Sequence, residues 1–305
     1  FYNIAKIVAT GGLVYLAGIL IEKSTSQGSS LYDANQHAWM IIMAILSAVM
    51  VLLGIYHIFM LPSGGKRAAA EVHRTGKQVM VELGEVLIDF FRKRHIVYYI
   101  CFIILYRFAE GFVMKIVPLF LKTEREMGGL GLSEKEIGLY YGSYGAAAFV
   151  LGSLLAGYYI SSRGLKKTLF TLCGIFNLPF LVYTLFAIFQ PTNGLLICSG
   201  IIFEYFGYGF GFVGLTLFMM QQIAPGKHQM AHYAFASGIM NLGVMIPGML
   251  SGWVCELFEE WFNKPSGYEP FFIFVLIATI PAFLITYFVP FKYNQDGTLI
   301  EGEKE

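Results

Sequence analysis

Three charged side chains interrupt a long apolar stretch at residues 96 to 121. Arg107 and Glu110 are three positions apart, a spacing that puts both on one face of a helix and allows an ion pair. At 1.5 Å per residue Arg107 lies about 16 Å into the stretch, close to the middle of a bilayer. Lys115 points to another side of the helix, from which its long side chain can reach the membrane–water interface. Because charge at this depth is costly, the pair is either a substrate or proton site or a structural ion pair.

A second deep carboxylate, Glu204, lies in a run rich in glycine and aromatic residues from Phe203 to Phe212. Glycines share its helix face, and glycine lets the backbone of a neighbouring helix approach closely. Glu204 could therefore carry a coupling proton, pair with Arg107, or serve helix packing. A stretch near residues 136 to 160 has a similar small-residue face. The glycines that we expect at helix contacts are Gly142, Gly145, Gly207 and Gly211.

Two further polar residues, His232 and Asn241, lie in the apolar stretch at residues 231 to 256. We expect them to line a cavity, with backbone bonding to a neighbouring helix as the alternative for Asn241. His228 and His232 are one helical turn apart, but no third ligand is near, so no metal site is predicted. The sequence has no HExxH, serine-hydrolase or Walker motif, so we expect neither an enzyme nor a cofactor.

The composition indicates the surroundings of the structure that holds these side chains. Hydrophobic residues make up 56% of the 305 residues and charged residues 13%, with a mean hydropathy of +0.63. Such a chain cannot cover itself with a solvated charged surface, so membrane lipid is its expected surrounding. The net charge of +1, with a dense basic run only at Arg92 to Arg94, argues against a nucleic-acid partner.

Hydropathy predicts eight membrane-spanning helices, each long enough to cross about 30 Å of hydrocarbon. If residue 1 is cytoplasmic, the inside segments hold thirteen lysines and arginines and the outside segments five. The positive-inside rule then places both ends of the chain in the cytoplasm. The predicted spans are residues 3 to 21, 37 to 61, 96 to 121, 136 to 160, 168 to 190, 195 to 222, 231 to 256 and 270 to 290.

The longest connection, residues 62 to 95, divides the chain. Within it apolar side chains from Val79 to Phe91 recur at helical spacing, which predicts an amphipathic helix on the cytoplasmic membrane surface. A soluble linker helix packed on loops is the alternative. We therefore divide the chain into residues 1–61, two helices of an N-terminal bundle; 62–95, the linker; 96–291, a six-helix bundle; and 292–305, a cytoplasmic tail.

Two helices, a basic linker and six more helices are the pattern left when a protein with two six-helix halves lacks its first four helices. We therefore predict an all-α membrane protein with a helical bundle of the major facilitator type, truncated to eight transmembrane helices. These comprise the last two of the first half and the complete second half.

Four segments carry a family resemblance: Leu105–Phe112, Gly128–Ser133, Phe203–Gly211 and Ala231–Ala234. With them the chain resembles the AmpG muropeptide permeases of the major facilitator superfamily, and more loosely the acetyl-CoA transporters, over residues 96 to 290. Gly157, Gly164 and Lys166 also resemble the glycine and basic loop of major facilitator proteins, although Ser161 stands where Asp is usual.

The resemblance implies a proton-driven permease that imports anhydromuropeptides from cell-wall turnover across the bacterial inner membrane. Its partners would be an anionic glycopeptide solute and protons, and Glu110 and Glu204 would lie on helices facing the cavity. The alternatives are a major facilitator transporter of another solute, such as a sugar, peptide, drug or acetyl-CoA-like anion, and a non-transporting membrane sensor or scaffold.

Overall fold

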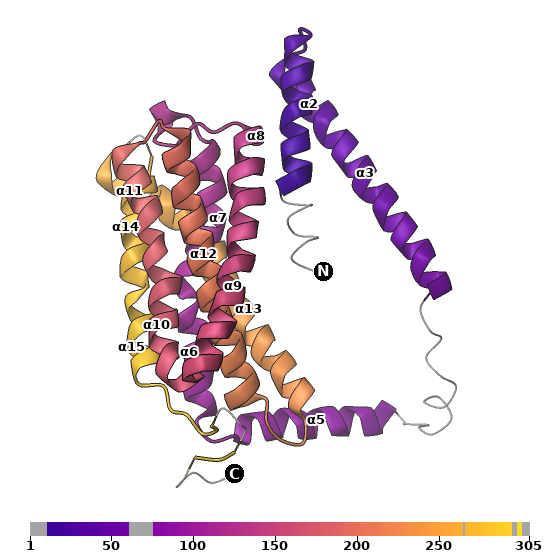
Figure 1. Ribbon diagram of the computed structural model, residues 1–305, viewed down its shortest axis with the longest axis vertical. Coiled ribbons are helices and arrows are strands. Elements are labelled where there is room, and N and C mark those ends of the chain that lie inside the picture. Colours follow the sequence, from indigo (N-terminus) through magenta and orange to yellow (C-terminus); the bar gives the residue numbers. More distant parts are fainter. Residues whose placement is uncertain (1–10, 61–75, 265, 295–297, 301–305) are drawn as a thin grey trace.

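A computed structural model describes residues 11–60, 76–264, 266–294 and 298–300 of the chain. The described elements are helices, joined by short loops (Figure 1). An N-terminal hairpin and the linker contain α2 (Val14–Ser26), α3 (Leu31–Met60) and α5 (Gly76–Arg92). The bundle that follows contains α6 (Ile96–Tyr106), α7 (Phe108–Lys122), α8 (Glu134–Ile137), α9 (Gly145–Arg163), α10 (Leu165–Asn177), α11 (Leu181–Phe189), α12 (Gly194–Phe218), α13 (Gln229–Phe262), α14 (Tyr268–Ala278) and α15 (Ile280–Tyr287).

Six helical stretches among the described residues are long and apolar enough to cross a membrane. They coincide with six of the eight predicted spans. The predicted span at 96 to 121 is formed by α6 and α7, which are interrupted at Arg107. The span predicted at 3 to 21 corresponds to α2, although residues 1–10 lie outside the described part. The predicted all-α class is confirmed, and the arrangement agrees with a bundle of the major facilitator type. The six stretches are Leu31–Met60, Glu134–Arg163, Leu165–Phe189, Gly194–Ile223, Gln229–Phe262 and Tyr268–Tyr287.

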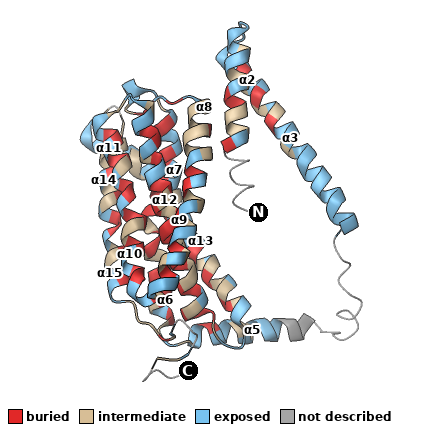
Figure 2. Cartoon of the chain, viewed as in Figure 1, coloured by how far each residue is buried: buried red, intermediate tan, exposed pale blue. Residues whose placement is uncertain are grey.

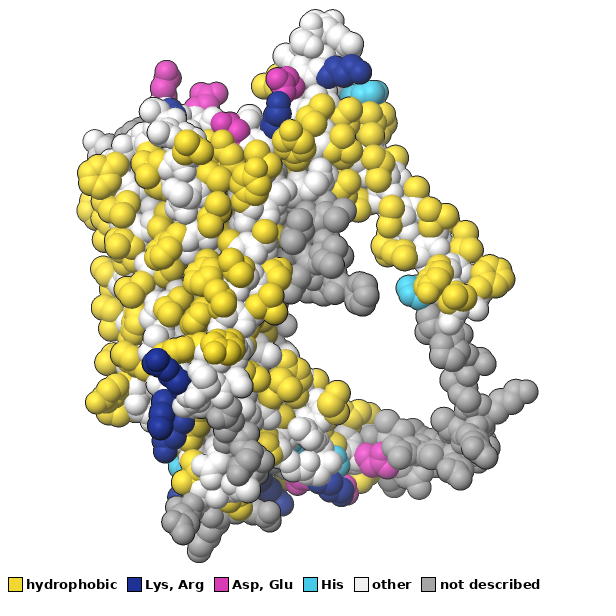
Figure 3. All heavy atoms as spheres, in the orientation of Figure 1, with side chains coloured by type: hydrophobic (Ala, Val, Ile, Leu, Met, Phe, Trp, Pro, Cys, Tyr) yellow, Lys and Arg dark blue, Asp and Glu magenta, His cyan; other side chains and the backbone are white. Residues whose placement is uncertain are grey.

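Burial follows the pattern of a protein in lipid. Buried residues concentrate inside the bundle, with large aromatic side chains such as Tyr99, Phe120 and Phe176 fully enclosed (Figure 2). On the face that Figure 3 shows, apolar side chains cover the outer surface of the bundle, and charged side chains gather towards its two ends. An apolar exterior between two charged ends matches a bilayer between two aqueous phases. The chain is an integral membrane protein.

Helix α12 packs between α9 and α10, and glycines set its distance from both. A Cβ on Gly209 would lie 2.1 Å from the Phe149 carbonyl oxygen of α9, and one on Gly152 would lie 2.3 Å from the Phe206 oxygen of α12. These distances are shorter than any real Cβ contact, so neither position accepts a larger residue without separating the helices. Glycine thus holds α12, which carries Glu204, against its neighbours.

The hairpin of α2 and α3 meets the bundle through α2. A Cβ on Gly18 would lie 2.5 Å from the Lys135 backbone nitrogen at the start of α8, and one on Gly138 would lie 2.4 Å from the Tyr15 nitrogen. Beyond this contact the hairpin diverges from the bundle (Figure 1). In α3 the buried residues, Ala34, Ala38 and Ile42, belong to its first half, and the residues from 47 to 60 are exposed.

The linker and the C-terminal segment meet at the base of the bundle. Helix α5 lies across the direction of the spanning helices there (Figure 1). Gln222, at the end of the α12 span, accepts hydrogen bonds from the Lys292 and Tyr293 backbone nitrogens at 2.8 and 3.0 Å and donates one to the Tyr293 oxygen. Part of the predicted linker, residues 61–75, and residues 301–305 of the predicted tail lie outside the described residues. The domain division at 61, 95 and 291 stays a prediction.

Candidate functional site

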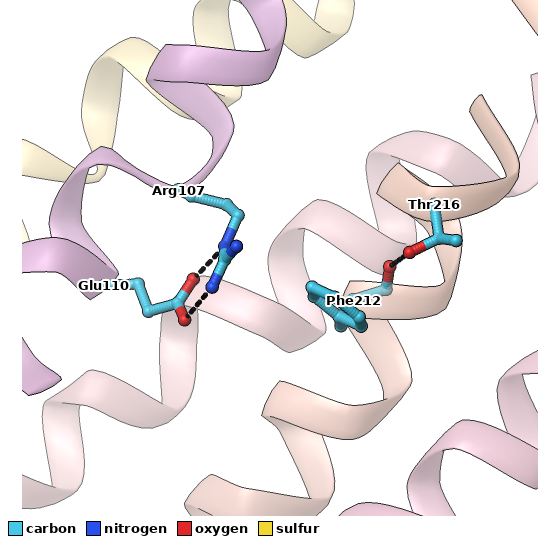
Figure 4. A network of polar contacts seen from close by, with 4 residues as sticks. All are labelled: Arg107, Glu110, Phe212 and Thr216. Carbon is cyan, nitrogen blue, oxygen red and sulfur yellow. Dashed lines mark hydrogen bonds and ion pairs between the residues drawn. The ribbon is translucent and has the colours of Figure 1, made fainter. Parts of the chain in front are cut away.

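The break between α6 and α7 positions an ion pair inside the bundle. Arg107 lies between the two helices with φ −106° and ψ 7°, outside helical geometry. Its Nε and Nη2 each donate to one carboxylate oxygen of Glu110 at 2.5 Å (Figure 4). Both side chains are buried, at 6% and 3% exposure. A two-point guanidinium–carboxylate contact of this kind fixes the orientation of both groups as well as neutralising their charges.

Two features of the surroundings favour this pair. Glu110 lies in the first turn of α7, where the positive end of the helix dipole favours a carboxylate. The guanidinium carbon of Arg107 lies 5.2 Å from the centre of the Phe212 ring on α12, within cation–π range (Figure 4). The Tyr208 side chain, one turn before Phe212, interacts with both members of the pair. Contacts with Phe212 and Tyr208 therefore hold Arg107 and Glu110 against α12.

Glu204, also on α12, is buried at 7% exposure. Its Oε2 accepts a hydrogen bond from the Tyr183 hydroxyl of α11 at 3.1 Å. The Tyr183 ring stacks on Phe272 of α14, with 5.8 Å between ring centres, which fixes the hydroxyl in place. The sequence left open a pair between Glu204 and Arg107, whereas in the structure Arg107 binds Glu110 and Glu204 binds Tyr183.

Several tyrosines lie near the two carboxylates. Tyr141, in the π-helical turn Gly138–Tyr144, and Tyr208 each lie within electrostatic range of both Glu110 and Glu204. Tyr141 also hydrogen-bonds to Tyr205 beside Glu204. Tyr208 hydrogen-bonds to Glu110, and Tyr183 donates to Glu204, so each carboxylate has a phenol hydroxyl beside it that can both donate and accept. We call Arg107, Glu110, Glu204 and these tyrosines, including Tyr183, the buried polar network.

Sequence reasoning missed the tyrosines of this network. Tyr205 and Tyr208 follow Glu204 by one and four positions, so Tyr208 shares its helix face, and this spacing could have marked it. Tyr141 and Tyr183 come from other helices, and nothing in the spacing of the sequence links them to Glu204.

The other predicted pathway residues lie apart from the network. His232 is buried near the start of α13, where its Nε2 lies 3.2 Å from the Val86 oxygen of α5 and its ring 5.7 Å from that of Phe90. Gly111, which follows Glu110 in the chain, contacts the Val244 oxygen of α13, about 18 Å further along that helix than His232. Asn241 is exposed on α13. A pathway role for either residue stays a prediction.

The four predicted packing glycines are at close helix contacts. Gly207 lies against the Ile175 oxygen and Pro179 of the neighbouring span, and a Cβ on Gly211 would lie 2.3 Å from that of Phe176. A Cβ on Gly145 would lie 3.0 Å from the Tyr205 ring, while the backbone of Gly142 faces Gly11.

A separate cleft of about 970 Å³ opens between α2, the start of α3 and α8. Its rim carries the ion pairs Lys122–Glu134 and Lys135–Glu22, the latter with 3.0 Å between Nζ and Oε2. No group of three metal-binding side chains comes together among the residues that the structure describes.

No protein-family model matches the chain. It is 25% identical over 191 residues to a candidate transporter, AmpG 1, of Rickettsia felis, covering 62% of this chain and 40% of the relative. It is 22% identical over 199 residues to the anhydromuropeptide permease of Escherichia coli K12, covering 65% of this chain and 37% of the relative. The resemblance to AmpG-type permeases is confirmed.

The relatives carry the names of transporters and a permease and not of enzymes, in agreement with the expectation that the chain is not an enzyme. The match to the corresponding AmpG 1 of Rickettsia bellii covers 66% of this chain and 45% of the relative. The chain thus spans less than half the length of the curated relatives that it matches.

Proposed function

We propose that the chain is part of a secondary transporter that imports anhydromuropeptides with protons across the bacterial inner membrane. The observation that carries the proposal is the buried polar network, which places a cation and two carboxylates inside a membrane bundle. Such groups are costly in a membrane, and they are typical of solute and proton pathways. The solute class comes from the name of the Escherichia coli relative.

Each charged residue has a role in this proposal. Arg107 binds an anionic group of the solute, and Glu110 holds the guanidinium in place until the solute competes for it. Glu204 takes up and releases the coupling proton, because it is a buried carboxyl group that accepts a hydrogen bond from a phenol. The tyrosines between the carboxylates let protonation of Glu204 influence the Arg107–Glu110 pair.

The proposal includes the architecture predicted from the sequence. The six helices from residue 96 form one half of a major facilitator bundle, α2 and α3 end the other half, and both chain ends face the cytoplasm. Rocking of two halves about a midplane site would expose that site to each side in turn. Another solute remains the alternative within transport, and a sensor or scaffold the alternative outside it.

Uptake of labelled anhydromuropeptide into a permease-null strain, with the full-length gene supplied in trans, tests the solute. We expect saturable uptake that collapses when the proton gradient is removed. Glu204→Gln should abolish accumulation against a gradient while downhill exchange persists, since only the protonatable group is lost. Glu126→Gln, at an exposed carboxylate, is the matched control and should transport normally.

The outcomes separate the hypotheses. Uptake of a different solute class alone would reject the muropeptide assignment and keep the transporter. Normal proton-dependent accumulation by an abundant Glu204→Gln protein would leave Glu204 with a packing role only. Abundant protein that transports none of the solute classes named above would favour the sensor or scaffold.

A further inference from the structure

Helix α5 divides its side chains among three faces. The first faces the bundle: Phe90 is buried at 1% exposure, and its ring packs 5.7 Å from both His232 and Phe235 of α13. Val86, one turn earlier, supplies the carbonyl that lies against His232. This face holds α5 to the start of α13.

A second face carries charge. At 100° per residue, Glu82, Glu85, Asp89 and Arg92 fall within an arc of about 80°. All four are exposed, and Asp89 Oδ2 lies 3.5 Å from His228 Nε2. This is the face that water would solvate.

The third face is apolar and exposed. Its residues fall within an arc of about 160° that contains none of the four charged residues. Each is 39% to 69% exposed. They are Met80, Val81, Leu83, Leu87, Ile88 and Phe91. A soluble helix packed on loops would not present so wide an apolar face to water.

We propose that this third face is a lipid-binding surface, which lies in the interface of the bilayer with α5 parallel to the membrane plane. Helix α5 runs across the spanning helices at their base, at the charged end of the bundle (Figures 1 and 3). In this place, an apolar face turned towards the bilayer would continue the lipid-facing surface of the bundle.

The arginines at the end of α5 also fit a lipid surface. Arg92 and Arg94 are exposed at the end of α5, beside the bundle, where they can meet anionic headgroups. Lys93 between them is engaged in the protein, donating to the Ile223 and Pro225 oxygens at 2.5 and 2.6 Å. The surface thus combines an apolar stripe with cations at one end, the pattern of interfacial helices.

Spin labels on single cysteines, in the whole chain freed of its four native cysteines, test the assignment. The protein is reconstituted in vesicles of phosphatidylethanolamine and phosphatidylglycerol, and collisions with oxygen and with a water-soluble nickel chelate are compared. We expect labels at Met80, Ile88 and Phe91 to favour oxygen and labels at Glu82, Glu85 and Asp89 to favour the chelate. A label at Phe90 should be shielded from both and serves as the packing control.

The measurement needs no transport, so it is independent of the proposed function. Preference for the chelate at Met80, Ile88 and Phe91 would show a helix surrounded by water and overturn the proposal. Shielding of these three positions from both reagents would show that protein, and not lipid, covers the face, and would overturn it equally. In the double variant Arg92→Gln/Arg94→Gln the label at Phe91 should lie shallower when phosphatidylglycerol is present, and a depth unchanged by the substitution would reject the contribution of the cations.

Discussion

The Arg107–Glu110 pair is costly to break and costly to keep. Both groups are buried, and each satisfies the other through two hydrogen bonds. Removal of one partner of a buried pair leaves an uncompensated charge and typically costs about 3 to 5 kcal/mol, whereas removal of both charges is often tolerated. This asymmetry can separate a structural role from a functional one.

We predict that Arg107→Gln strongly lowers the amount of folded protein and that the double change Arg107→Gln/Glu110→Gln restores it. If Arg107 also binds an anionic solute group, uptake stays lost in the double variant, and Arg107→Lys rescues poorly because the planar fork is gone. Detergent-stable protein and uptake are measured on the same membranes. Recovery of abundance and uptake together in the double variant would show that the pair is structural.

Lys93 is partly buried at the base, where it donates to two carbonyls. Burial, and secondly the positive charge of Lys292, lower the pKa of Lys93 to about 8, against a smaller opposing effect of Asp89. The unfolded chain, with an ordinary lysine pKa, therefore binds more protons between about pH 8 and pH 10.5. The penalty for a charged Lys93 is complete below this window and vanishes above it.

We therefore predict that deprotonation of Lys93 increases the free energy of unfolding as pH rises from 8 to 10.5. The thermal midpoint in detergent should rise over this window in the parent relative to Lys93→Met. Above about pH 10.5, where the parent no longer carries the penalty, the variant should be less stable by about 1 to 3 kcal/mol, because the Ile223 and Pro225 carbonyls have lost their donor. Lys166→Met, at an exposed position, is the control. An equal pH profile in parent and Lys93→Met would contradict the assignment.

At the residue scale, spacing predicted local contacts and little else. The three-residue interval between Arg107 and Glu110 indicated their pair because a helix brings such positions together. Tyr183 and Gln222 were missed, since their partners come from segments 21 and about 70 positions away. Contacts of that kind depend on how helices pack, which apolar periodicity does not specify.

At the scale of elements, α12 depends on glycine for its position. A Cβ on Gly207 would lie 2.4 Å from the Ile175 oxygen and 2.5 Å from Cγ of Pro179, whereas one on Gly157 of α9 would meet nothing within 4 Å. Two glycines on neighbouring helices thus differ only in their surroundings.

We predict that Gly207→Ala lowers the thermal midpoint and weakens uptake, because α12 must move away from the preceding span. Gly157→Ala should be neutral or stabilising by up to about 1 kcal/mol, since alanine favours a helix over glycine. Unfolding of the purified variants in detergent measures both. Equal midpoints for the two substitutions would mean that this contact is more adaptable than its geometry implies.

The length of the apolar stretches predicted where the helices lie, but it did not predict the break at Arg107. The segments on either side are continuous in hydropathy, and no proline lies nearer than Pro118. The break coincides with the charged pair, where side-chain contacts override the helical preference of the backbone. The amphipathic pattern of 79 to 91 did predict α5, and the structure adds that Val86 and Phe90 face α13.

At the scale of the whole molecule, the lysine and arginine bias predicts which ends are cytoplasmic. Single cysteines at Glu126 and Thr192, in a cysteine-free background, should react with an impermeant thiol reagent in intact cells. Cysteines at Lys167 and Lys227 should react only after permeabilisation. All four positions are exposed, so packing does not confound the comparison. Reaction of the last two in intact cells would reverse the proposed orientation.

Hydropathy could not predict how the hairpin sits on the bundle. The contact depends on backbone meeting backbone at Gly18 and Gly138, reinforced by the ion pair between Glu22 and Lys135. By the proposed orientation this contact is on the outer side, so an importer that rocks must open it to admit solute. Backbone contact at two glycines can close and separate without repacking side chains at those points.

A covalent bond across this contact should therefore stop transport. A Cβ on Gly18 would lie 2.9 Å from Cβ of Lys135 and 2.5 Å from its backbone nitrogen, so a cysteine at position 18 requires α2 and α8 to move apart. That movement brings the two Cβ atoms towards the separation of about 3.5 to 4.5 Å that a disulfide needs. In the full-length transporter we expect oxidation of the double variant Gly18→Cys/Lys135→Cys to abolish uptake and reduction to restore it. Each single-cysteine variant controls for the lost glycine or ion pair and should be insensitive to oxidation. Full uptake by completely cross-linked protein would show that α2 and α8 stay together through the cycle, and the moving interface would have to lie elsewhere.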